Sequence, residues 1–213
     1  MSSTHSSRLS DSYPAGYAAV RKLVAERLGR QWCLFIDRDG VINRQVIGDY
    51  VRDWQDFEWL PRAPLALKGL REWAPYMVVV TNQQGIGKGL MRVDDVELIH
   101  RNVRVELATY GVLMDAVRVC PHLESAGCAC RKPRPGLILD WLEQHPDIDH
   151  SLSVMVGDSE SDLQLAQHVA AQTDGCASVL IGDLNTQAVP DASFESLWDF
   201  AVAVERAREE QRQ

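Results

Sequence analysis

Two aspartates one residue apart, Asp37 and Asp39, are the residues of this chain that are best placed for chemistry. They follow the short apolar run 33–36, which is typical of a buried strand. Alternate residues of a strand share a face, and two neighbouring carboxylates require a cation or a shared proton. A turn neutralised by Arg38 is the structural alternative, because Asp and Gly are common in turns. The pair alone does not decide between these interpretations.

Other reactive residues also follow apolar runs, namely Thr81, Asn82 and Gln83, then Arg131 and Lys132, then Asp158 and Asp162. In open α/β sheets, ligands bind beyond the carboxyl ends of the strands. Acids, a hydroxyl and a lysine at several such ends are difficult to explain as ordinary loops. We therefore expect one site, in which carboxylates hold a hard divalent cation and a lysine binds an anion.

The elements that would position this site alternate along the chain. Apolar runs predict strands at 33–36, 77–80, 116–119, 152–156 and 177–181. Helical patterns predict helices near 15–28, 64–73, 94–110, 137–144, 160–170 and 193–206. This alternation predicts an α/β fold with a doubly wound, mostly parallel sheet. We expect a disordered tail at 1–14, a single domain at 15–206 and a frayed C-terminus at 207–213.

Length, charge and hydropathy narrow the functions that are possible. A chain of 213 residues suits one sizeable domain. Its net charge of -8 disfavours nucleic acid as a partner, since phosphate backbones are bound by clustered Lys and Arg. No apolar run approaches the roughly 20 residues of a membrane span, and the polar N-terminus lacks the core of a secretory signal. We expect a cytoplasmic monomer that acts on an anionic small molecule.

A second cluster, made of Cys120, His122, Cys128 and Cys130, has the composition of a zinc site. Three thiolates and one imidazole fill the four positions of a closed structural site. Crowded cysteines in a cytosolic chain indicate a metal rather than disulfides. We expect Zn²⁺ to hold this loop just before Lys132 and to take no part in catalysis.

The ordered motifs resemble those of the haloacid dehalogenase superfamily of phosphotransferases over residues 33–181. The matches are Asp37-Arg38-Asp39-Gly40, Thr81-Asn82, Lys132 and Gly157-Asp158 with Asp162. The resemblance implies that Asp37 is a nucleophile that forms an aspartyl-phosphate and that Asp39 is the acid and base. It also implies that Mg²⁺ is held by Asp37, Asp158 and the backbone carbonyl of Asp39. An acid near neutral pH needs a pKa above the usual value of about 3.9, so we expect the pKa of Asp39 to be raised.

The role of Asp162 stays open at this point. It could reach the metal through water, hold Lys132, or be an acid that is favoured near a helix N-terminus. We favour a role in support of the residues that contact the phosphate.

Cys-x-His…Cys-x-Cys-Arg-Lys-Pro resembles two zinc-bearing branches of the superfamily that lack a cap domain, the D-glycero-D-manno-heptose 1,7-bisphosphate 7-phosphatases and the histidinol-phosphate phosphatases. Residues 48–51 and 81–89 resemble the substrate loops of the heptose branch. That branch implies substrate or phosphate contacts for Asn43, Tyr50, Thr81, Asn82, Gln83, Gln84, Arg131 and Lys132. The short gap from His122 to Cys128 is closer to the histidinol-phosphate branch, and Ser159 replaces the lysine that is usual in heptose enzymes.

The heptose branch implies a Mg²⁺-dependent phosphatase that removes the 7-phosphate of the heptose bisphosphate, for the biosynthesis of nucleotide-activated heptose. A histidinol-phosphate phosphatase is the alternative. A catalytically idle binding protein on the same fold is the remote alternative, and the complete set of acids and the lysine argue against it.

Overall fold

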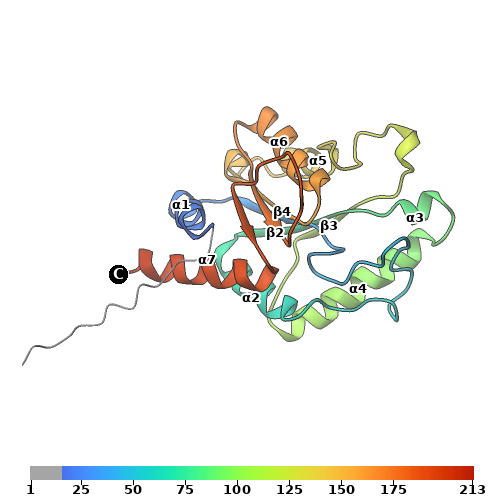
Figure 1. Cartoon of the computed structure of the whole chain (residues 1–213), viewed down its shortest axis with the longest axis horizontal. Helices are drawn as coiled ribbons and strands as arrows, with labels where there is room; N and C mark the ends of the chain where they lie inside the picture. Colours follow the sequence, from blue (N-terminus) through green and yellow to red (C-terminus); the bar gives the residue numbers. More distant parts are fainter. Residues whose placement is uncertain (1–15) are drawn as a thin grey trace, which may run out of the picture.

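The computed structural model describes residues 16–213, so the predicted tail at 1–14 lies outside the described residues. One sheet holds the strands β1 (Cys33–Ile36), β2 (Tyr76–Asn82), β3 (Ala116–Cys120), β4 (Val154–Gly157), β5 (Ala177–Ile181) and β6 (Ala192–Phe194). Their order is β3-β2-β1-β4-β5-β6, and all neighbouring strands are parallel. The chain therefore winds outward from β1 in both directions, which confirms the predicted doubly wound α/β fold (Figure 1).

The helices in the described part of the chain are α1 (Tyr17–Arg27), α2 (Ala63–Trp73), α3 (Gln84–Gly87), α4 (Val93–Thr109), α5 (Gly136–Glu143), α6 (Glu160–Thr173) and α7 (Leu197–Gln211). Two short 3-10 helices, η1 (Glu124–Ala126) and η2 (His150–Leu152), lie in the connections. No helix within residues 16–213 is long and apolar enough to cross a membrane.

Helices cover both faces of the sheet because alternate residues of each strand face opposite sides. Leu34 and Ile36 of β1 belong to a core that they share with α1, α2, α4 and α7. Cys33 and Phe35 belong to a second core, shared with α5 and α6. These two helices lie on the side of the sheet opposite to α2, α4 and α7 (Figure 1). Burial on both faces explains why the strand reads as a continuous apolar run.

The C-terminal segment differs from the prediction in two respects. Residues 193–206, predicted as one helix, contain the end of β6 and then the first part of α7. The first turn of α7 is capped by Ser196, whose hydroxyl accepts a hydrogen bond from the backbone N–H of Asp199. The helix continues to Gln211, past residue 207 where fraying is predicted. It continues because Ala207 is buried and Arg208 donates a hydrogen bond of 2.8 Å to the backbone carbonyl of Glu72 in α2.

The loop that follows β1 crosses the carboxyl edge of the sheet without forming a domain of its own. Between β1 and α2 it forms only isolated bridges, which pair Asn43 with Asp39 and with Trp59. Within the described residues, no insertion between the strands folds as a separate cap. The carboxyl ends of β1, β2 and β4 are therefore not covered by a cap domain within the described residues.

Candidate active site

The carboxylate of Asp37, which lies directly after β1, contacts the ammonium of Lys132. Asp37 Oδ1 is 2.6 Å from Lys132 Nζ, and Oδ1 of Asp162 is 2.7 Å from the same nitrogen. The ammonium also donates a hydrogen bond of 3.2 Å to the backbone carbonyl of Val80 in β2. Asp37, Lys132 and Asp162 are all buried. Charge-assisted hydrogen bonds therefore fix the lysine between the ends of three elements.

Two carboxylates contact this one ammonium and a third, that of Asp158, lies close to them, so their charge is incompletely neutralised. Oxygen atoms of Asp37, Asp158 and Asp162 lie within 4.8 Å of one another. Burial raises the pKa of Asp37 to about 8, with Asp162 adding to the shift and Lys132 opposing it. Burial and the charge of Asp162 raise the pKa of Asp158 to about 6. A cluster of carboxylate oxygens with excess negative charge is the donor set that suits a hard divalent cation such as Mg²⁺.

Both oxygens of Asp162 are already engaged. Oδ1 contacts Lys132, and Oδ2 accepts hydrogen bonds from the backbone N–H of Ser159 at 3.1 Å and from its hydroxyl at 2.5 Å. The Ser159–Asp162 pair forms a capping box that begins α6. Of the roles that the sequence leaves open for Asp162, the structure shows two, the contact with Lys132 and the position of an acid in the first turn of a helix. Asp37 and Asp158 keep oxygens for a cation.

The carboxylate of Asp39 is held by a ring of three donors. Arg38 Nη2 donates to both carboxylate oxygens at 2.8 Å, Asn43 Nδ2 donates to Oδ1 at 2.9 Å, and Gln83 Nε2 donates to Oδ2 at 2.8 Å. Burial favours a higher pKa, but Arg38 first and then the two amides outweigh it, so the pKa of Asp39 is lowered. The expectation of a raised pKa is therefore wrong for this structure, because the donors stabilise the charged form.

The structure gives three predicted substrate-binding amides other tasks. The side chains of Asn43 and Gln83 are fully buried and hold Asp39, and Gln83 also donates to the Thr81 hydroxyl at 2.9 Å. The Asn82 side chain clamps the backbone of Lys132, because its oxygen accepts from the Lys132 N–H at 3.0 Å and its nitrogen donates to the Lys132 carbonyl at 3.2 Å. These amides position the charged residues of the site.

A cavity of about 250 Å³ opens above these residues at the carboxyl edge of the sheet. Its lining comprises Asp37, Asp39, Gln45, Val46, Asp49, Tyr50, Val51, Thr81, Asn82, Lys132, Asp158, Ser159 and Ser161. Tyr50 therefore lies where the sequence predicts it, whereas Gln84 and Arg131 are not in this lining, and the Gln84 side chain instead accepts from the backbone N–H of Glu124 at 2.9 Å. Asp49 lies in the predicted substrate loop 48–51, whereas Gln45 and Ser161 were not singled out from the sequence.

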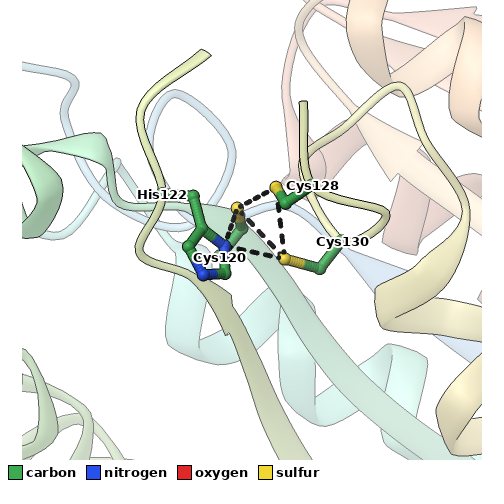
Figure 2. A group of neighbouring side chains, drawn as sticks. All are labelled: Cys120, His122, Cys128 and Cys130. Atoms are coloured by element: carbon green, nitrogen blue, oxygen red, sulfur yellow. Dashed lines mark hydrogen bonds between the residues drawn. The ribbon is translucent and has the colours of Figure 1, made fainter. Parts of the chain in front are cut away.

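The four residues of the Cys/His cluster converge on one point between β3 and the loop that follows it (Figure 2). Their sulfur atoms are 3.4 to 3.6 Å apart, and Nδ1 of His122 is 3.7 Å from the Cys120 sulfur and 3.2 Å from the Cys130 sulfur. These separations exceed the disulfide bond length of about 2.05 Å. Zn–S bonds of about 2.3 Å in a tetrahedron place the sulfurs about 3.8 Å apart, so the donor set and its spacing fit Zn²⁺.

The loop of the Cys/His cluster leads directly to the active-site lysine. Cys120 is the last residue of β3, and its carbonyl accepts a hydrogen bond of 2.8 Å from the backbone N–H of Gln83. Arg134, two residues beyond Lys132, donates a hydrogen bond of 2.7 Å to the carbonyl of Cys128. The segment that carries Lys132 is therefore tied back to the loop of the Cys/His cluster by a hydrogen bond.

Comparisons with known proteins agree with this geometry. Residues 129–194 match the family model of HAD-hydrolase-like proteins. A Mycobacterium tuberculosis protein named D-glycero-alpha-D-manno-heptose-1,7-bisphosphate 7-phosphatase is 64% identical over 188 residues, which cover 88% of this chain and 99% of that protein. A Rhodopseudomonas palustris protein named for the beta anomer is 39% identical over 145 residues, or 65% of this chain and 79% of that one.

A solved structure shares the fold as well. The crystal structure of D,D-heptose 1,7-bisphosphate phosphatase from B. bronchiseptica, complexed with magnesium and phosphate, matches with a TM-score of 0.70 at 31% identity, and the match covers 84% of this chain and 99% of that chain. One relative is 64% identical along nearly its whole length, and this chain has the acids and the lysine at the edge of a doubly wound sheet. The chain therefore belongs to the D-glycero-D-manno-heptose-1,7-bisphosphate 7-phosphatase family of haloacid dehalogenase-like hydrolases.

Proposed function

We propose that this protein is a Mg²⁺-dependent phosphatase that removes the 7-phosphate from D-glycero-α-D-manno-heptose 1,7-bisphosphate. The observation that carries the chemistry is the buried contact of Asp37 with Lys132 in a cavity that Asp39 also lines. A nucleophilic carboxylate, an ammonium for the phosphate and a second acid are the groups that phosphoryl transfer through an enzyme-bound intermediate requires. The names of the relatives supply the sugar, and those at 64% identity carry the alpha anomer in their names.

In the first half of the proposed reaction, the carboxylate of Asp37 attacks the phosphorus atom of the 7-phosphate. The bond between phosphorus and the C7 oxygen breaks, and that oxygen leaves with the electron pair and takes a proton from the carboxyl group of Asp39. The Lys132 ammonium and the Thr81 hydroxyl stabilise the negative charge on the phosphoryl oxygens. A dianionic phosphate beside Asp39 raises its pKa by repulsion, which opposes Arg38 and favours the protonated acid that this step needs.

In the second half, Asp39 acts as a base. It takes a proton from a water molecule, whose oxygen attacks the phosphorus of the aspartyl-phosphate, and the bond to Asp37 breaks to release inorganic phosphate. Arg38, Asn43 and Gln83 stabilise the carboxylate form of Asp39, which is the form that this half requires. The same acid therefore serves both halves.

We assign Asp37, Asp158 and the backbone carbonyl of Asp39 as the groups that would hold Mg²⁺. The excess negative charge of the carboxylate cluster supports this assignment. When bound, the ion neutralises charge on the phosphate and on the attacking carboxylate.

We further propose that Cys120, His122, Cys128 and Cys130 bind a structural Zn²⁺. All four coordination positions come from the protein, which leaves none for a substrate. The loop is too short to have a core of its own, so the metal would substitute for one. Its effect on catalysis would be mechanical, through the position of Lys132.

Replacing Asp37 is expected to abolish turnover, and replacing Asp39 is expected to lower it strongly. Asp37→Asn removes the nucleophile, and Asp39→Asn is expected to lower kcat by about 10²- to 10⁴-fold, the usual contribution of a general acid or base. The measurement is phosphate release from the heptose bisphosphate, with thermal unfolding to verify the fold. Full activity of the Asp37→Asn protein would contradict the mechanism, and wild-type protein that is inactive with Mg²⁺ would indicate an idle binding protein.

Gly40→Ala is expected to weaken Mg²⁺ binding. Gly40 has φ of +86°, and a Cβ at this position would lie 1.8 Å from Oδ2 of Asp158, so that carboxylate must move. The matched control is Gly111→Ala, whose φ is +75° and whose Cβ would meet nothing within 4 Å. Both variants should lose about 1–3 kcal/mol of unfolding free energy through backbone strain. Only Gly40→Ala should need more Mg²⁺ for half-maximal phosphate release, and an equal requirement would argue against Asp158 as a ligand.

Purified protein is expected to contain about one equivalent of zinc per chain, as a closed four-ligand site implies. Cys130→Ser should lose that zinc and raise KM in the presence of saturating Mg²⁺, because Lys132 loses its support. Cys176→Ser, which replaces a cysteine outside the cluster, is the control and should retain both properties. Metal analysis that finds no zinc in active protein would refute the structural role.

The substrate assignment predicts an order of rates. With Mg²⁺ present, kcat/KM should be highest for the alpha anomer of the heptose bisphosphate, lower for the beta anomer and lowest for histidinol phosphate. The comparison is made at one enzyme concentration, with EDTA in parallel as the metal-free control. Faster hydrolysis of histidinol phosphate would replace the proposed substrate while leaving the mechanism intact.

A further inference from the structure

A buried contact behind the active site takes no part in the mechanism above. Nη1 of Arg38 lies 3.2 Å from Nε2 of His100, although the two residues are 62 positions apart in the chain. Arg38 is 2% exposed and His100, from α4, is 8% exposed. A side chain from a helix on one face of the sheet thus reaches the residue between the two catalytic aspartates.

The direction of this hydrogen bond follows from the chemistry of the two groups. A guanidinium carries five N–H donors and no acceptor, so Nε2 of His100 must accept and the imidazole must be neutral with its proton on Nδ1. Burial, followed by the positive charge of Arg38, lowers the pKa of His100 to about 3. The acceptor is therefore available near neutral pH.

The guanidinium of Arg38 is fixed from two sides. Nε and Nη2 donate to Asp39 at 3.2 and 2.8 Å, while Nη1 meets His100. Because the guanidinium is planar, fixing Nη1 also fixes the orientation of the edge that faces Asp39.

A cavity of about 500 Å³ lies beside His100, and its lining combines apolar residues such as Val96 and Val119 with the charged residues Glu97, Arg101 and Arg104. Without an acceptor at position 100, Nη1 of the buried guanidinium would lose the partner that His100 provides. An unpaired buried donor is unfavourable, so the guanidinium would reorient and loosen its hold on Asp39.

We propose that His100 is a positioning residue that, by accepting from Arg38, holds the guanidinium against Asp39 and so fixes the carboxyl group that protonates the leaving oxygen. The inference rests on the proposed phosphatase function and adds to it a residue of α4 that lies outside the substrate cavity.

Two substrates separate this role from a general effect on folding. The sugar C7 oxygen is a poor leaving group that needs a proton from Asp39, whereas p-nitrophenolate leaves from p-nitrophenyl phosphate without one. The ratio kcat/KM covers the steps from free enzyme to the departure of the alcohol, and so it excludes later hydrolysis of the aspartyl-phosphate. Loss of positioning of Asp39 should therefore lower kcat/KM for the sugar phosphate selectively.

Three variants make the comparison. His100→Leu removes the acceptor at similar volume, and it should lower kcat/KM for the heptose bisphosphate about 100-fold but that for p-nitrophenyl phosphate less than about 5-fold. His100→Gln, whose amide oxygen can accept from Arg38, should stay within about 5-fold of wild type on both substrates. Val103→Ala, one turn along α4 at a residue that is 3% exposed, removes packing alone and should affect both substrates equally.

Equal losses on both substrates in His100→Leu, or a selective loss in Val103→Ala, would overturn the proposal. If His100→Leu does not fold, His100→Asn, whose shorter amide does not reach Arg38, takes its place with the same expectation. Wild-type protein that hydrolyses histidinol phosphate but not the heptose bisphosphate would refute the proposed substrate alone. The His100 variants would then be compared on histidinol phosphate and p-nitrophenyl phosphate.

Discussion

The buried ammonium of Lys132 is the group on which the rest of the site depends. It joins Asp37 at the end of β1, Val80 in β2 and Asp162 at the start of α6. Buried carboxylates at such short separations repel one another and lose hydration, and Lys132 opposes the resulting rise in the pKa of Asp37. The backbone of Lys132 is in turn clamped by Asn82 and follows the loop of the Cys/His cluster. One positive charge thus holds three elements in register.

The two aspartates of the first motif have opposite electrostatic environments although one residue separates them. Asp37 lies among carboxylates, which with burial raise its pKa, whereas Asp39 lies among donors, which lower its pKa. Different environments for two neighbouring acids are how proteins give them different chemical tasks. The excess negative charge around Asp37 suits a cation, whereas the donors around Asp39 hold it as a carboxylate.

Much of the fold was predictable because the physical signals are local. The strand β1 was predicted with its observed bounds, since a strand buried on both faces is a continuous apolar run. The strand β6 was missed, because its three residues are too few to show a pattern. The site was predictable in residue type but not in every role. Asn43 and Gln83 were expected to contact substrate, yet their amides donate to Asp39, and an amide can serve either purpose.

The sequence by itself determined the order of the acids, the lysine and the Cys/His cluster along an alternating α/β chain. Those features follow from residue type and spacing, because local hydrophobic periodicity predicts where the strands and helices lie. Only the tertiary structure decided that Asp162 holds Lys132, that His100 meets Arg38 and that the pKa of Asp39 is lowered. The first two depend on contacts between distant segments. The third depends on the balance between burial of Asp39 and the hydrogen bonds from Arg38, Asn43 and Gln83, and this balance exists only once the chain has folded.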